Sequence, residues 1–281
     1  MRMRAFPSFP HAGGAGILLV LSVAAAVLPA CSVKEDRRGC PCLLRLDFSE
    51  TSEPERPERL LLSAVSDDGF SLAETLEMSE VRDIHEIRVP RSGVRLNLWS
   101  DDAGDYVGKD GLAIPFGDDC PPVLMYSASV ETSGETCTEK VVLHKNYCRL
   151  TVIADGEDGY PFNFGVLGNV DGYGADGCPH RGAFFHYLIP EAAHSGDGIT
   201  AGESGRVMLL PRQTDQSLVL EVMEGTEILK TFALGNYIVQ SGYDWTSPDL
   251  EDIAVRIDYA STRITIEVGA WEYSYDVDIE F

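Results

Sequence analysis

Basic residues are scarce in this sequence. The 281 residues include 22 Lys and Arg against 45 Asp and Glu, and the formal net charge is −23. Nucleic-acid binding relies on Lys and Arg to neutralise backbone phosphates, so this balance argues against nucleic acid as a partner. It favours a soluble, well-hydrated surface instead.

The sequence also lacks recognisable catalytic and metal-binding patterns. It contains no H-E-x-x-H, G-x-S-x-G or P-loop pattern, and His85-Glu86 is not followed by a second histidine. Cys40-Pro-Cys42 has the wrong spacing for a zinc pair, and Cys178-Pro-His180 stands alone. The glycine-rich stretch from Gly168 to Gly182 lacks the ligand spacing of an EF-hand, so we expect a long surface loop there. We predict no catalytic site and no metal site.

Only one long apolar run is present, from Ile17 to Leu28. A membrane-spanning helix takes about 20 residues, so this run is too short to span comfortably. It follows Arg2 and Arg4 and precedes Leu28-Pro-Ala-Cys31, which is the order of a secretory signal with a cysteine directly after the cleavage site. We predict that residues 1–30 are a lipoprotein signal peptide and that Cys31 becomes the lipidated first residue. The alternative is a plain secretory signal with a bystander cysteine.

Residues 31–42 are predicted to be a lipidated linker. A diacylglycerol on Cys31 would hold the protein stably, because two acyl chains bind a bilayer far better than one. Lys34 followed by Glu35 and Asp36 resembles a Bacteroidota-type signal for export to the cell surface, and a solvated linker is the equal alternative. We therefore expect a protein of the cell outer membrane, held there through its N-terminal lipid and exposed at the surface.

Six further cysteines remain in the mature chain. Export to an oxidising compartment favours disulfides, but the sequence alone does not choose among the pairings. Cys40 and Cys42 are too close to pair easily, so at least one of them should reach elsewhere. The candidate disulfide cysteines are Cys40, Cys42, Cys120, Cys137, Cys148 and Cys178.

Period-two alternation of apolar residues predicts a chain of short strands. In the first strand Leu44, Leu46 and Phe48 share one face. The other predicted strands cover residues 60–65, 94–98, 123–130, 139–154, 206–210, 218–222, 228–234, 253–259 and 264–268. Helical periodicity is weak, and single short helices are expected at 72–78 and 248–252.

This spacing of strands predicts an all-β sandwich architecture. Removing residues 1–30 leaves enough chain for two domains of ordinary size. We place an N-terminal β-sandwich at residues 43–146 and a C-terminal β-sandwich at residues 147–281.

The last segment has the clearest alternation in the sequence. Its apolar face consists of Trp271, Tyr273, Tyr275, Val277, Ile279 and Phe281, and acidic residues and Ser274 form the other face. Each apolar side chain could contribute about 1.5–3 kcal/mol when buried, so this face must be covered. Either the strand completes its own sandwich, or it is lent to or paired with a neighbouring subunit through strand addition.

Four aromatic residues near the glycine-rich stretch allow two interpretations. Tyr173, Phe184, Phe185 and Tyr187 could form a sugar-binding face, or they could pack in the core and against a loop. Packing is the favoured interpretation, and a glycan partner stays an open alternative.

Both ends of the mature chain are similar to a known family. The segment Cys31-Ser-Val-Lys-Glu-Asp-Arg-Arg-Gly-Cys40-Pro-Cys42, running into Leu44-Arg-Leu-Asp-Phe48, resembles the start of the FimB-type fimbrial anchor lipoproteins of Bacteroidales type V pili. The second half resembles them in Gly242-Tyr-Asp-Trp245, Asp249-Leu-Glu-Asp-Ile253, Ile257-Asp-Tyr-Ala260, Arg263-Ile-Thr-Ile266 and Trp271. The middle is similar only in its pattern.

The resemblance implies two transthyretin-like β-sandwich domains in tandem, no enzyme activity and no cofactor. It implies an outer-membrane subunit at the base of a fimbria that joins the shaft subunit, by β-strand complementation, and limits the length of the shaft. Shaft subunits lose their first strand to a protease that cuts after arginine, whereas an anchor should keep the strand of Leu44, Leu46 and Phe48. The bond Arg59-Leu60 looks cleavable, because Pro57 protects the bond after Arg56 but nothing similar follows Arg59.

Three functions therefore compete. A pilus anchor or related fimbrial subunit is the first, and a surface adhesin or glycan-binding lipoprotein of the tip type is the alternative. A secreted hydrolase is disfavoured by the missing catalytic constellation.

Overall fold

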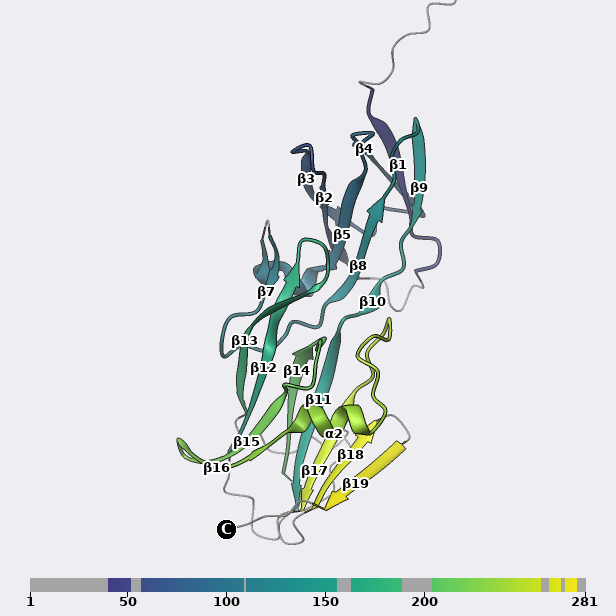
Figure 1. Ribbon diagram of the computed structural model, residues 1–281. Helices are drawn as coiled ribbons and strands as arrows, with labels where there is room; N and C mark the ends of the chain where they lie inside the picture. The colour runs from purple at the N-terminus through teal and green to yellow at the C-terminus, as the bar shows by residue number, and fades with distance from the viewer. Residues whose placement is uncertain are drawn as a thin grey trace, which may run out of the picture. The chain divides into compact units, whose positions relative to one another are not determined.

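The computed structural model describes residues 40–51, 57–108, 110–155, 163–188, 204–258, 263–268 and 271–276. Within these ranges the chain is all-β (Figure 1), with one short α-helix, α2 (Leu234–Gln240), and one 3-10 helix, η4 (Asp101–Tyr106). The fold class predicted from the alternation is confirmed, because the strands form two β-sandwiches in tandem.

The first sandwich consists of two sheets that share one core. Sheet A has the strand order β4-β1-β9, and sheet B has the order β10-β8-β5-β2-β3. The alternation of each strand sends one set of side chains between the sheets, where Leu46, Leu62 and Leu96 are almost fully buried. The strands are β1 (Cys42–Asp47), β2 (Arg59–Val65), β3 (Ser71–Glu77), β4 (Ile84–Val89), β5 (Val94–Ser100), β8 (Leu124–Val130), β9 (Thr136–Lys140) and β10 (His144–Lys145).

The first strand lies in the middle of its sheet. β1 is antiparallel to β4 on one side and parallel to β9 on the other. Its inward side chains Leu44 and Leu46 are 0% exposed, and Phe48, just after it, is 1% exposed. The strand predicted at this position is confirmed. It lies between β4 and β9 and contributes its inward side chains to the core.

The second sandwich is larger. Sheet D has the order β14-β11-β17-β18-β19, and sheet C has the order β16-β15-β12-β7-β6, with β13 also paired to β12. The strands are β6 (Val107–Gly108), β7 (Gly111–Ala113), β11 (Tyr147–Asp155), β12 (Asn163–Gly174), β13 (Pro179–Leu188), β14 (Ser204–Pro211), β15 (Val219–Glu224), β16 (Glu227–Phe232), β17 (Ile253–Asp258), β18 (Arg263–Val268) and β19 (Trp271–Asp276).

The core of the second sandwich includes residues from the first half of the chain. Trp99, Leu112 and Val123 belong to the same buried cluster as Leu150 and Phe164. β7 also pairs with the end of β12, so sheet C contains strands from both halves. The domain boundary between residues 146 and 147 stays a prediction.

Two expected short helices are wrong. Residues 72–78 form β3, whose side chains alternate beside β2, with Leu76 opposite Leu60. β3 is an edge strand with one shallowly buried face, which explains why its alternation is weak in the sequence. Residues 248–252 are irregular because the side chains of Asp249 and Asp252 accept hydrogen bonds from the backbone N–H groups of Lys145 and Arg149. The helix α2, by contrast, was not predicted. Only its first residue, Leu234, belongs to a predicted element, the strand at 228–234.

The long surface loop expected at residues 168–182 is also wrong, since β12 and β13 pair there as a hairpin. Its glycines serve close packing and register shifts within sheet C. A Cβ atom on Gly172 would lie 2.0 Å from the carbonyl oxygen of Leu112. The single strand predicted at 139–154 is divided among the end of β9, β10 and β11, and within it Cys148, Leu150 and Val152 share the buried face.

Candidate functional site

The C-terminal strand forms an edge of sheet D. β19, yellow in Figure 1, pairs antiparallel with β18, and no other described strand pairs with its outer side. Residues 271–276 of the predicted segment thus join their own sandwich. Val277, Ile279 and Phe281 lie outside the described residues, and Tyr273 and Ser274 are the positions of β19 whose exposure is described.

Tyr273 marks the inner face of sheet D at this edge. It lies opposite Ile266, whose side chain is fully buried in the core. Residues directly opposite one another in an antiparallel pair point to the same face, so the ring of Tyr273 faces the interior side of the sheet. It is nevertheless 37% exposed. The opposite layer therefore leaves the inner face of β19 partly uncovered.

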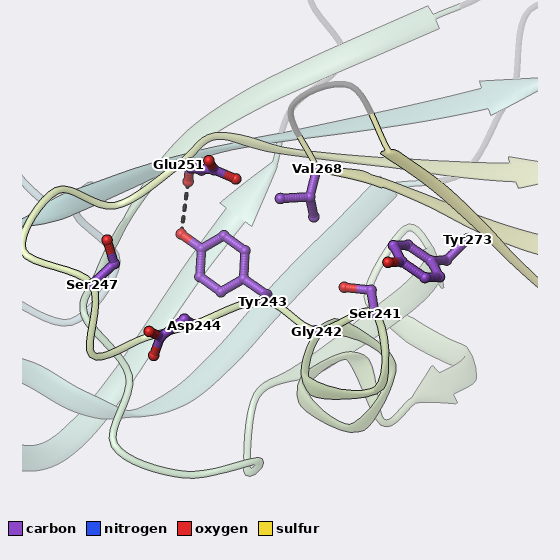
Figure 2. A pocket seen from close by; sticks show the side chains of 8 residues that line it. All are labelled: Ser241, Gly242, Tyr243, Asp244, Ser247, Glu251, Val268 and Tyr273. Carbon is purple, nitrogen blue, oxygen red and sulfur yellow. Dashed lines mark hydrogen bonds between the residues drawn. The ribbon is translucent and has the colours of Figure 1, made fainter.

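A cavity of about 350 Å³ lies beside Tyr273. Figure 2 shows Tyr243 among the lining residues, with Val268 and Tyr273 contributed by β18 and β19 and with Ser241 and Gly242 contributed by the segment that follows α2. The lining residues are Ser241, Gly242, Tyr243, Asp244, Ser247, Glu251, Val268 and Tyr273. The cavity is therefore bounded by the edge strand on one side and by the segment after α2 on the other.

The wall that follows α2 is held by its own hydrogen bonds. The Ser241 hydroxyl donates to the carbonyl oxygen of Ile238 at 2.6 Å, and the Tyr243 hydroxyl donates to the carbonyl oxygen of Glu251 at 2.7 Å. The rings of Tyr243 and Trp245 meet edge to face with centroids 4.6 Å apart. Gly242 has a φ of +84°, a left-handed conformation that suits glycine at the end of a helix.

The cavity lining is acidic. It includes Asp244 and Glu251, and its described residues include no Lys, Arg or His. Hydrogen bonds from the hydroxyl and the backbone N–H of Thr246, and then the charge of Arg212, lower the pKa of Asp244, so this carboxylate is charged at neutral pH. Burial, followed by the neighbouring Cys148 thiol, raises the pKa of Tyr243, which therefore stays a neutral hydrogen-bond donor. This arrangement offers negative charge and an aromatic ring but no nucleophile paired with a base.

Arg212 fixes the acidic segment from behind. Its guanidinium donates to the carbonyl oxygens of Ser247 and Pro248 at 2.7 and 3.0 Å, and also to that of Trp245. The same group contacts the side-chain oxygen of Asn146. Backbone carbonyl oxygens and Asn146 therefore use the hydrogen-bond donors of the Arg212 guanidinium. Arg212 is not among the described residues that line the cavity.

The bond that looked cleavable lies within a paired strand. β2 begins at Arg59, which pairs with Glu77 across to β3. The Arg59 guanidinium also forms an ion pair with Asp101. Leu60 is 0% exposed and pairs with Leu76 and with Ser100. The Arg59-Leu60 bond is therefore held between two neighbouring strands.

The six candidate disulfide cysteines are free thiols in this structure. Cys40 and Cys178 are exposed, Cys137 is half-buried, and Cys42, Cys120 and Cys148 are buried. Burial raises the pKa of Cys148 to about 12. The pairing stays a prediction, and the lipidation site Cys31 lies outside the described residues.

The four aromatic residues near the hairpin divide into two groups. Tyr173 and Phe184 are 1% and 2% exposed and belong to the core, as the packing interpretation predicted. Phe185 and Tyr187 lie nearer the surface, where Phe185 stacks on Phe116 with centroids 5.3 Å apart. Phe116 is 70% exposed on a turn and was not anticipated, because a single aromatic residue in a loop carries no periodic signal.

The described residues contain neither a metal-binding cluster nor a membrane-spanning helix. No group of three or more His, Cys, Asp and Glu side chains in them is placed to hold a metal ion. None of the helices in the described ranges has the length and apolar character needed to cross a bilayer.

No protein-family model matches the chain, and no curated protein matches it either. Solved structures do match. The fimbrial anchor protein Mfa2 from Porphyromonas gingivalis matches with a TM-score of 0.58 and 15% identity, over 84% of this chain and 100% of that one. A protein from Bacteroides thetaiotaomicron, provisionally described as polysaccharide-binding, matches with a TM-score of 0.60 and 13% identity, over 83% and 98% of the two chains.

A third match is a protein from Bacteroides ovatus, provisionally described as an adhesin. Its TM-score is 0.59 at 9% identity, over 85% of this chain and 97% of that one. At such identities the similarity establishes the fold. The chain therefore shares its fold with these three proteins.

Proposed function

We propose that this chain is a subunit of a surface fimbria and that it acts as the lipid-tethered anchor at the base of the fimbria. It has no catalytic role in this proposal and needs no cofactor. The fold shared with a protein named as a fimbrial anchor supports the proposal. The predicted lipoprotein signal peptide of residues 1–30, directly followed by Cys31, supports the location in the outer membrane.

The single observation that carries the proposal is the position of β1. This strand follows the predicted linker and is held on both sides, by β4 and by β9. Leu44 and Leu46 are fully buried in the core. A lipid on Cys31 is then joined to the folded body through a strand whose removal would expose the core, which is what an anchor requires.

The lipid is tested by substituting its attachment site. We expect Cys31→Ala to abolish labelling by a palmitate analogue and to release the chain from washed membranes. Cys40→Ala is the matched control and should keep both the label and the membrane association. A Cys31→Ala chain that stays labelled and membrane-bound would overturn the anchor proposal.

The connection to the shaft is tested by truncation after Gly269. The full chain should capture a fimbrial shaft subunit from membranes, and the truncated chain, checked for folding by circular dichroism and thermal melting, should capture less. If the truncated chain folds and captures the same amount, attachment uses another surface. If neither form captures a shaft subunit, the anchor role is wrong.

A surface adhesin is the second candidate function. The observation that favours it is the aromatic group formed by the exposed Phe116 and the half-buried Phe185 and Tyr187, because accessible rings can stack on sugar faces. A glycan array separates the two functions. Binding that disappears in Phe116→Ala supports the adhesin, and an array without binding disfavours it.

A further inference from the structure

We propose that the unpaired edge of β19, together with the cavity beside Tyr273, is a docking site for an extended segment of a partner subunit that carries a basic side chain. The inference rests on the proposed function for the identity of the partner as a fimbrial subunit. It goes beyond that function in naming the face that binds and the chemistry that the face selects.

The first supporting feature is the strand edge. Sheet D ends at β19, and none of the described strands occupies its outer side. Such an edge presents backbone N–H and C=O groups that a further strand can join. Tyr273 and Ser274, the residues of β19 whose exposure is described, are both exposed, so neither face of the strand is fully covered at its centre.

The second feature is the position of the cavity relative to that edge. An added strand would lie about 4.8 Å from β19, with alternate side chains on the inner face of sheet D. Tyr273 points to this inner face and borders the cavity of about 350 Å³. A side chain of the added strand next to Tyr273 would therefore reach the cavity, and its volume accommodates a Lys or Arg side chain.

The third feature is the charge of the lining. Asp244 and Glu251 supply two carboxylates, and no Lys, Arg or His is among the described residues of the lining. The charge of the nearby Arg212 offsets part of that of Asp244, which leaves Glu251 as the carboxylate without a basic residue in the lining. The ring of Tyr273 adds a face that attracts a cation. An added strand with a basic side chain would thus bind through the carboxylates, through the ring of Tyr273 and through the backbone edge of β19.

Two other occupants fit less well. A second copy of this chain carries the same net charge of −23, so two acidic edges would repel each other. A neutral sugar would find one accessible ring, because Tyr243 is 9% exposed and packs edge-on against Trp245. A basic extended segment is therefore the occupant that the surface selects.

The test uses the full mature chain in detergent and three labelled peptides. Each peptide is a nine-residue alternation of Thr and Val in which the central residue is replaced by Arg, Gln or Glu. The three peptides differ only at this central position. Fluorescence anisotropy at low salt should show the Arg peptide binding about tenfold more tightly than the Gln peptide, with the Glu peptide weakest. The double variant Asp244→Asn, Glu251→Gln should erase this preference.

The matched control removes the same two charges elsewhere. Glu224 and Glu227 are exposed at the turn between β15 and β16. The double variant Glu224→Gln, Glu227→Gln should keep the preference for the Arg peptide. Equal loss in both double variants would mean that the preference comes from net charge, and the proposal would be wrong.

Further outcomes also overturn the proposal. These are equal binding of the Arg and Gln peptides, binding of arginine amide as tight as that of the Arg peptide, and glycan binding that is lost in Tyr273→Ala without any peptide binding. Failure here is distinguishable from failure of the anchor function. The peptide preference can be absent while Cys31 still carries the lipid and the shaft is still captured, and a chain without lipid can still show the preference.

Discussion

Gly177 shows how closely the turn between β12 and β13 lies against sheet B. Its φ is +74°, and a Cβ atom there would lie 2.3 Å from the Cβ atom of Ser127. The same turn accepts hydrogen bonds at its backbone carbonyl groups from the side chains of Asn97 and Ser127. Both the backbone conformation and the packing therefore require glycine at this position.

A substitution at Gly177 separates these two effects. We expect Gly177→Ala to lower the free energy of unfolding by about 2–4 kcal/mol, because the side chain meets both a left-handed φ and a steric clash. Gly225→Ala is the control, since Gly225 has a φ of +60° but no atom within 4 Å of the added Cβ. It should cost only about 1 kcal/mol. Urea denaturation measures both, and equal losses would mean that the turn is not packed against Ser127.

Cys148 should make the free energy of unfolding depend on pH in the alkaline range. Its pKa is raised by burial from 9.0 to about 12. Its stabilising contribution is therefore complete below pH 9 and declines as the pH rises from 9 towards 12, because the unfolded chain can ionise and the folded chain cannot. Between pH 8 and pH 10.5 this thiol should reduce the free energy of unfolding by about 1–2 kcal/mol.

The Cys148→Ala variant isolates that effect. Its absolute stability is lower because a cavity forms, but its loss of stability between pH 8 and pH 10.5 should be smaller than that of the unsubstituted chain. Denaturant midpoints at the two pH values provide the comparison. An identical pH dependence in the two chains would show that Cys148 is not a buried thiol.

At the scale of elements, the pairing of β2 protects the Arg59-Leu60 bond, which looks cleavable from the sequence alone. Proteases bind their substrate as a single extended strand, whereas Arg59 is already paired with β3, and Leu60 with both β3 and β5. An arginine-specific protease should therefore leave the Arg59-Leu60 bond of the folded protein intact and cut it after denaturation. Mass spectrometry gives the result directly. A fragment beginning at Leu60, recovered from the folded protein, would contradict this expectation and the retention of β1.

Strands with one fully buried face could be predicted from the sequence. β17 and β18 alternate cleanly because Ile253, Val255 and Ile266 all enter one core. β12 and β13 could not be predicted, because glycines interrupt their apolar pattern and are needed for contacts such as that of Gly172 with Leu112, far away in sequence. The cavity could not be predicted either, since Tyr273 meets the segment after α2 only through the register of β18 and β19.

At the scale of the whole molecule, the acidic surface is the dominant property. A net charge of −23 destabilises a folded chain through repulsion among its own carboxylates. Salt screens this repulsion, with a Debye length of about 10 Å at 0.1 M. We expect the melting temperature to rise by several degrees, or about 1 kcal/mol in stability, between 10 mM and 500 mM NaCl. A melting temperature that falls with salt would mean that attractive ion pairs outweigh the repulsion.

The central position of β1 also has a mechanical meaning. A fimbria in moving fluid pulls on its attachment, and a lipid-tethered chain would carry that tension along β1. β1 is paired with β4 from Cys42 to Asp47 and with β9 from Leu43 to Asp47. The hydrogen bonds on both sides run across the strand, so a pull along it loads them in shear, together and not one after another. A tether on the N-terminal side of β1 would therefore pull on a strand that can slide out only by the simultaneous rupture of two ladders.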